Sequence, residues 1–205
     1  MLLPHIRCRQ FLVDGMTRGM TVLDIGCGDG DLMSELIGIG CTVKGVEIDR
    51  SLVRACQAKG MPVSEGRAER LPIEDSSVDA IVCSVVLSYT LERQAVEEWA
   101  RVLKPGGVIN ATYHGIGYGL NYLFYGPRFK TRVYGFRMLA NTLFYRLTSH
   151  RLPGFLGDTL CQTSRRMMTY YRTFGLRLER EQVVGVVAGT PRFLCHRVIK
   201  PILPK

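Results

Sequence analysis

Short apolar runs alternate with stretches of helical periodicity over the first half of the chain. Runs rich in Val, Ile and Leu predict five strands, over residues 21–25, 41–48, 62–66, 78–86 and 108–113. Helices are predicted between them, from about residue 29, over 51–60 and over 92–103. Strands that alternate with helices predict a parallel sheet with right-handed crossovers, which is a doubly wound α/β fold.

The end of the chain has a different pattern. Residues 176–189 and 191–200 are two β-rich runs joined by a short connection of Gly, Thr and Pro. This pattern predicts an antiparallel hairpin at the edge of the sheet, which brings the sheet to seven strands.

Apolar residues recur at helical spacing within residues 135–147. They are Phe136, Leu139, Ala140, Leu143, Phe144 and Leu147. The spacing predicts an amphipathic helix. We expect its apolar stripe to pack on the protein core, and a helix lying on a membrane surface is the alternative.

Basic and aromatic residues are concentrated in residues 113–175. This segment holds nine Lys and Arg residues against one acid, which accounts for +8 of the formal net charge of +9, and 14 of the 18 aromatic residues. We therefore predict a single domain over residues 1–205. It comprises a cofactor-binding half (1–112), a helical, aromatic and basic cap insertion (113–175) that selects the substrate, and a C-terminal hairpin (176–205).

The seven cysteines form no Cys-x-x-Cys pair, and several lie in apolar runs. They are predicted to be buried thiols rather than disulfides or metal ligands. The longest apolar runs fall well short of the roughly 18 residues that span a bilayer, and the N-terminal residues lack the apolar stretch of a signal peptide. These observations predict a cytoplasmic protein.

Gly26, Gly28 and Gly30 lie in the turn between the first predicted strand and its helix. A glycine turn at this place lets a ligand approach the backbone and the N–H groups that begin the helix. A dinucleotide fingerprint would need glycine at position 31, where Asp31 stands, and no Gly-Lys-Ser/Thr of a P-loop follows. The turn therefore predicts an anionic or adenosine-bearing ligand that is not a dinucleotide.

Four motifs occur in order along the chain: VLDIGCGDG from residue 22, GVEID from 45, AERLPIEDSSVDAIVCSVVL from 68 and RVLKPGGVI from 101. Over residues 20–112 the chain resembles class I S-adenosylmethionine-dependent methyltransferases, particularly the type 11 group that includes ubiquinone and menaquinone methyltransferases. The resemblance implies a Rossmann-like fold, S-adenosylmethionine as methyl donor and S-adenosylhomocysteine as product.

The resemblance also implies cofactor contacts at the glycine turn. Gly26, Cys27 and Gly28 would line the methionine part of the cofactor, and Gly30 would complete the turn. Asp24, at the end of the first strand, would lie near the amino group.

Further contacts are implied beyond the later strands. Glu47 would accept both ribose hydroxyls, Ile48 would pack on the adenine, Ala68 and Glu69 would approach the adenine edge, and Ser84 would face the sulfonium.

One position departs from the family pattern. Many relatives have an Asp where this chain has Arg67, and that Asp accepts a hydrogen bond from the adenine amine. Arg67 cannot accept one. Either Glu69 substitutes for the missing acceptor, or the adenine is held less tightly.

Methyl transfer from a sulfonium is an in-line displacement that needs positioning and a dry site, and a base if the acceptor is a hydroxyl. Candidate bases are His114, just past the fifth strand, and His150 in the cap, while Tyr89 could orient the acceptor. A loop hydrogen bond is the alternative role for His114. No metal is required.

We expect O-methylation of a small-molecule acceptor, namely a glycan, a lipid-linked compound or another polyhydroxylated molecule. An anionic group on the acceptor, or peripheral contact with an anionic membrane, would suit the basic cap. Nucleic acid is disfavoured because no RNA-binding module is recognisable. The alternatives are a non-catalytic methyltransferase-like subunit that binds S-adenosylmethionine or a partner protein, and a nicotinamide oxidoreductase, which the glycine spacing disfavours.

Overall fold

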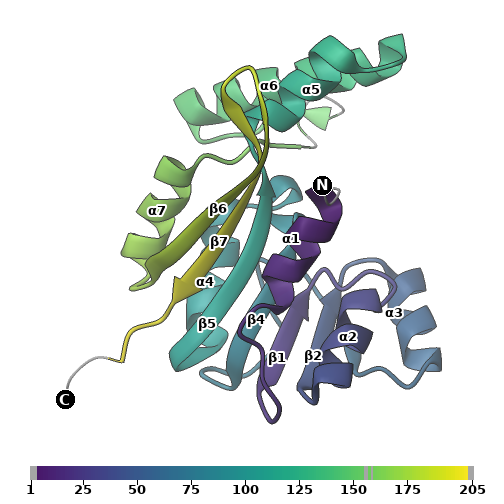
Figure 1. Cartoon of the computed structure of the whole chain (residues 1–205), viewed down its shortest axis with the longest axis vertical. Coiled ribbons are helices and arrows are strands. Elements are labelled where there is room, and N and C mark those ends of the chain that lie inside the picture. Colours follow the sequence, from purple (N-terminus) through teal and green to yellow (C-terminus); the bar gives the residue numbers. More distant parts are fainter. Residues whose placement is uncertain (1–3, 155–156, 158, 203–205) are drawn as a thin grey trace.

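The computed structural model describes residues 4–154, 157 and 159–202 (Figure 1). It contains one seven-stranded sheet in the order β3-β2-β1-β4-β5-β7-β6. The strands are β1 (Thr21–Ile25), β2 (Thr42–Glu47), β3 (Val63–Glu65), β4 (Val78–Ser84), β5 (Leu103–His114), β6 (Arg177–Val187) and β7 (Thr190–Ile199). Strands β1 to β5 pair in parallel, and β7 runs antiparallel to both of its neighbours. The predicted fold class and the C-terminal hairpin are confirmed.

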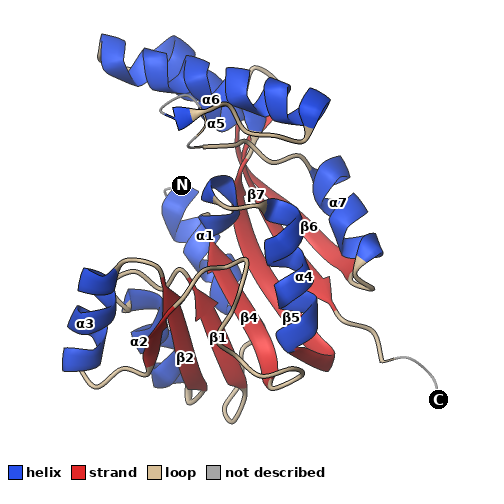
Figure 2. Cartoon of the chain, turned by 180° about the vertical axis from the view of Figure 1, so that it is seen from behind, coloured by secondary structure: helices blue, strands red, loops and turns tan. Residues whose placement is uncertain are grey.

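Helices cover both faces of the sheet. They are α1 (Pro4–Val13), α2 (Asp31–Ile39), α3 (Arg50–Ala58), α4 (Glu92–Val102), α5 (Ile116–Tyr125), α6 (Phe129–Thr148) and α7 (Ser164–Thr173), with a 3-10 turn η1 (Val86–Tyr89) after β4. Helices α1 and α2 lie in front of the sheet in Figure 1, whereas α4 and α7 lie in front of it in the reverse view of Figure 2. Strand order reverses between β1 and β4, so the crevice expected for a ligand lies beyond their carboxyl ends.

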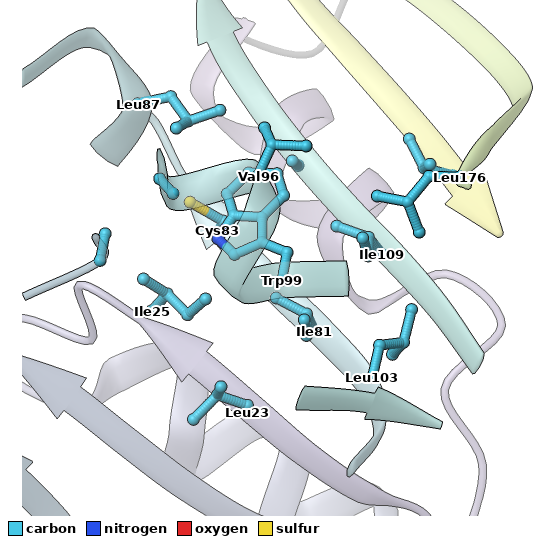
Figure 3. Packing of buried hydrophobic residues seen from close by; sticks show 14 of the residues in the cluster. Leu23, Ile25, Ile81, Cys83, Leu87, Val96, Trp99, Leu103, Ile109 and Leu176 are labelled. Carbon is cyan, nitrogen blue, oxygen red and sulfur yellow. The ribbon is translucent and has the colours of Figure 1, made fainter. Parts of the chain in front are cut away.

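Two hydrophobic cores follow from the twofold alternation of the strands. Val22 of β1 belongs to the cluster beneath α1, α2 and α3, while its neighbour Leu23 belongs to the cluster beneath α4 and α7. Trp99 of α4 is fully buried in the second cluster, close to Ile81 and Cys83 (Figure 3). These two cores hold the carboxyl ends of the central strands in fixed positions.

Helix α4 confirms the stripe predicted from its periodicity. Ala95, Val96, Trp99, Val102 and Leu103 are all inaccessible to solvent. The helix ends one residue earlier than predicted, because the chain at Leu103 is already extended and begins β5.

Helix α1 was not predicted. It precedes the first strand in the chain and buries Phe11 and Leu12. Its sequence carries only weak periodicity, but a proline at the first helical position is an ordinary start signal.

The expected packing of residues 135–147 is wrong. The helix forms as part of α6, but Phe136, Leu143 and Leu147 of the apolar stripe are 62%, 59% and 75% exposed. The buried side instead presents Met138, Asn141, Thr142 and Tyr145. Asn141 explains this orientation, because it donates to the carbonyl of Thr159 and accepts from the amide of Leu152. A connecting segment with polar backbone groups therefore covers the polar side of α6.

All seven cysteines are free and buried, as predicted. Among the described residues, none of the helices combines the length and apolarity that crossing a membrane would require.

Candidate active site

The glycine turn lies between β1 and α2, at the point where strand order reverses. Gly26, Gly28 and Gly30 all adopt left-handed φ angles, of 72°, 57° and 87°. A Cβ on Gly26 would collide with Val86, so this position needs glycine for close packing. A Cβ on Gly28 would meet no atom within 4 Å, whereas one on Gly30 would collide with Met61. The turn thus leaves its middle open and anchors its end against the protein.

Two cavities meet at Gly26. One, of about 340 Å³, is lined by residues of the turn, of β4 and β5, and of α1; the other, of about 270 Å³, lies beside the ends of β2 and β4. The predicted residues Asp24, Gly26, Cys27 and Ser84 line the first cavity. Glu47, Ile48, Ala68 and Glu69 line the second, together with Arg67 and Tyr89. Gly28 and Gly30 line neither.

Asp24 is the most unusual group in the first cavity. Its side chain is 2% exposed, and its Oδ2 has no hydrogen-bond partner among the described residues. Burial, and secondarily the negative charge of Glu47, raises the pKa of Asp24 to about 7. The hydroxyl of Thr112, which lines the same cavity, is also buried without a partner. Orphaned polar atoms of this kind indicate a site that a polar ligand completes.

Glu47 is held rigidly at the end of β2. Its Oε2 accepts from the amide of Gly28 at 3.0 Å, and its Oε1 accepts from the amides of Ile48 and Asp49 at 2.8 and 3.1 Å. The carboxylate therefore ties the glycine turn to the second strand. Oε2, which accepts a single bond, keeps lone-pair capacity for a hydroxyl of a ligand in the second cavity.

The carboxylate of Glu69 contacts two groups of the protein. Its Oε1 accepts from the amide of Leu91 at 3.0 Å, and its Oε2 lies 3.6 Å from Nε of Arg67. Arg67 thus pairs with the acid that could replace the missing acceptor, and both oxygens of that acid keep lone-pair capacity.

Several lining residues were missed by the sequence interpretation. Cys8, Arg9 and Leu12 of α1 line the first cavity, as do Thr112 and Phe193. The arginine is fixed by Glu35 at 2.7 Å. No local motif marks these residues, and only the fold brings them to the glycine turn.

A cluster of aromatic rings surrounds His114. His114 stacks on Tyr118, with ring centroids 3.7 Å apart and planes within 10°. Phe193 of the first cavity and Tyr89 of the second lie 5.8 and 6.4 Å from the His114 ring.

The three candidate catalytic residues have different surroundings. Burial lowers the pKa of His114 to about 4, so the imidazole is neutral at pH 7 and is a weak base. Its Nδ1 is buried without a partner among the described residues. Tyr89 is 55% exposed beside it. His150 is exposed and donates from Nδ1 to the carbonyl of Thr148. Of the three candidates only Tyr89 lines one of the two cavities, whereas His114 and His150 line neither.

A larger cavity of about 720 Å³ lies between α6 and α7. It shares no lining residue with the two cavities at the glycine turn. The orphaned polar atoms of Asp24 and Thr112 identify the smaller pair as the candidate site.

Comparison with known proteins identifies the kind of domain that the chain resembles. Residues 23–111 match the family model of the methyltransferase domain. The chain is 29% identical over 121 residues to tRNA (carboxymethyluridine(34)-5-O)-methyltransferase of Arabidopsis thaliana. The aligned region covers 53% of this chain and 30% of that protein. It is 33% identical over 117 residues to ubiquinone/menaquinone biosynthesis C-methyltransferase UbiE of Citrobacter koseri, covering 50% of this chain and 47% of that protein. The chain thus spans less than half of either relative.

The fold also has solved counterparts. A SAM-dependent methyltransferase of Methanosarcina mazei superposes with a TM-score of 0.69 at 19% identity, covering 98% of this chain and 99% of that one. Together with the family match, this confirms the resemblance that the four motifs indicated.

Proposed function

Because residues 23–111 match the methyltransferase domain model, we propose that this protein binds S-adenosylmethionine and transfers its methyl group to a small-molecule acceptor at the two cavities. The observation that carries the proposal is Asp24, a buried carboxylate in the cavity beside the glycine turn whose Oδ2 has no hydrogen-bond partner among the described residues. An ammonium group is the partner that such a carboxylate lacks, and the cofactor's methionine part has one.

The remaining predicted cofactor contacts extend this assignment. Gly26 and Cys27 would contact the methionine part in the first cavity, and Ser84 would face the sulfonium. Glu47 would accept from the ribose hydroxyls, while Ile48 and Ala68 would enclose the adenine in the second cavity. The lining of both cavities by these residues supports the assignment.

When bound, S-adenosylmethionine supplies an electrophilic methyl group. The chain's own task is then to hold the acceptor in line and to exclude water. Phe193 of the first cavity and Tyr89 of the second support an acceptor with a ring that can lie against aromatic groups. The neutral imidazole of His114 can accept a hydrogen bond from an acceptor hydroxyl, and Tyr89 can orient it.

We propose O-methylation of a glycan, lipid-linked or other polyhydroxylated acceptor, and an anionic group on it would suit the basic segment around α6. The named relatives act on tRNA oxygen and in quinone C-methylation, so the bond formed must be determined by experiment. A non-catalytic subunit that binds S-adenosylmethionine is the second candidate, because Arg67 engages Glu69 at the adenine side of the site.

Calorimetry with S-adenosylmethionine, S-adenosylhomocysteine and NAD tests the ligand. We expect binding of the first two and none of NAD, and an Asp24→Asn variant should lose most of the binding. NAD binding in place of the sulfonium compound would contradict the proposal.

Transfer from methyl-labelled S-adenosylmethionine to polar and lipid extracts, followed by identification of the labelled bond, tests the reaction. Tight cofactor binding with no labelled product would favour the non-catalytic candidate.

A further inference from the structure

The outward side of α6 is apolar. Phe129, Phe136, Leu143 and Leu147 are 81%, 62%, 59% and 75% exposed. At 100° per residue these four positions fall within about 40° of one another around the helix axis, so they form one stripe along a helix of about 30 Å. We call this stripe the α6 outer face. At the end of α5, Phe124 and Tyr125 are also exposed, at 57% and 72%.

The α6 outer face cannot turn inward without breaking internal contacts. Asn141 makes two hydrogen bonds on the opposite side of the helix, and Thr142 accepts from the amide of Cys161. A Cβ on Gly135 would lie 2.5 Å from the backbone nitrogen of Leu123, so α5 and α6 are in backbone contact. The two helices therefore form a fixed platform at one end of the molecule (Figures 1 and 2).

Cations border the apolar stripe. Arg128, Lys130, Arg132 and Arg146 are all exposed and lie at the start of α6 or to either side of its stripe. No Asp or Glu occurs between His114 and Asp158, so the platform has no acid of its own to pair with them. An apolar stripe bordered by Lys and Arg is the arrangement of helices that lie in the interface of an anionic bilayer.

We propose that the α5–α6 platform docks on the surface of a membrane containing anionic lipids, with the α6 outer face in the boundary between headgroups and acyl chains. A second copy of the chain is a poorer occupant. A twofold contact through this face would bring its cations together without any acid to compensate them. The inference does not depend on methyl transfer, and it is tested without cofactor.

The test is flotation of the full chain with vesicles of phosphatidylcholine alone and of phosphatidylcholine with about 30% phosphatidylglycerol. We expect binding to the anionic vesicles, weaker binding to the neutral ones, and a decrease as the salt concentration rises from about 0.05 to 0.5 M. The double variant Phe136→Ser with Leu143→Ser should bind the anionic vesicles at least about tenfold less. Ile37→Ser with Ile202→Ser, which removes exposed apolar side chains elsewhere, should bind normally.

Phe129→Ser with Leu147→Ser replaces the other two residues of the stripe. This second variant should also bind the anionic vesicles at least about tenfold less, and it serves as the test if the first variant does not fold. The proposal is overturned if the wild type does not bind anionic vesicles, or if both stripe variants bind as the wild type does. It is also overturned if the wild type is a dimer that the stripe variants convert to monomers, because the face is then covered by a second copy.

Discussion

The buried position of Asp24 in the site lowers the stability of the unliganded protein. A buried carboxylate without a donor is destabilising unless it is protonated, and its pKa of about 7 reflects this. Between its ordinary value of 3.8 and about 7, the folded protein binds one proton more than the unfolded chain. The free energy of unfolding therefore falls as pH rises through this window.

Asp24→Asn should consequently stabilise the unliganded protein while weakening cofactor binding. We expect a gain of about 2–4 kcal/mol in the free energy of unfolding at pH 8 and little change near pH 4. Urea unfolding at the two pH values measures the first effect, and calorimetry measures the second. A variant that is less stable at pH 8 would show that Asp24 has a partner in the unliganded protein.

Binding of S-adenosylmethionine by the wild type should also depend on pH. If the ionised Asp24 receives the ammonium group, affinity rises as pH increases from 6 to 8, roughly tenfold or less, because the carboxylate must first lose its proton. Asp24→Asn should remove this dependence. Equal slopes in the two proteins would assign the effect to another group.

Glu47 combines a structural role with its predicted ligand role, so the conservative variant is the informative one. Glu47→Gln retains the shape but loses one acceptor, and we expect cofactor affinity to fall by about 1.5–3 kcal/mol, or roughly 10–150-fold. Calorimetry measures the loss, with Glu65→Gln at the end of β3 as the control. Unchanged affinity in a folded Glu47→Gln protein would remove this residue from the site.

At the scale of elements, a buried ion pair fastens α7 to α4. Arg166 donates to both carboxylate oxygens of Glu92, at 2.8 Å each, and Gln162 donates to the same carboxylate at 2.9 Å. Glu92 is completely buried, so its charge depends on these donors.

Arg166→Met should therefore destabilise the protein by about 3–5 kcal/mol, because it leaves the Glu92 carboxylate buried and without its cation. Arg172→Met on the exposed side of α7 is the matched control, for which we expect a change within about 0.5 kcal/mol. Urea unfolding compares the two. Similar small losses would mean that Gln162 and water suffice for Glu92.

At the scale of the whole molecule, the net positive charge is concentrated in one segment of the chain. The cofactor cavities lie in a half of the chain that is nearly neutral, whereas residues 113–175 carry almost all of the net positive charge. Cofactor binding and surface binding should for this reason respond differently to salt.

Ligand binding should be visible as a shift of the whole unfolding transition. S-adenosylmethionine at about 100 times its dissociation constant adds about 2.7 kcal/mol, which for a chain of this size raises Tm by about 5–10 °C. Moderate salt should change this shift little, while vesicle binding falls. Thermal unfolding with and without cofactor at two salt concentrations measures it, and a shift abolished by salt would place the ligand in the basic segment instead.

The sequence by itself determined the features that depend on near neighbours in the chain. The apolar runs of β1 and β4, the helical stripe of α4 and the glycine turn after Asp24 are local patterns. They sufficed to predict the doubly wound sheet, the C-terminal hairpin and the methyltransferase resemblance. The predicted cofactor residues other than Gly28 and Gly30 line two adjoining cavities, and their individual contacts remain predictions.

Only the tertiary structure decided which surfaces meet. Periodicity shows which residues of α6 share a face, but the direction of that face depends on the distant segment that bonds to Asn141 and Thr142. In the same way, Arg9, Thr112 and Phe193 come from separate parts of the chain and reach one cavity through the sheet. The burial of Asp24 without a partner arises from this convergence, because desolvation depends on everything packed around a group and not on its neighbours in sequence.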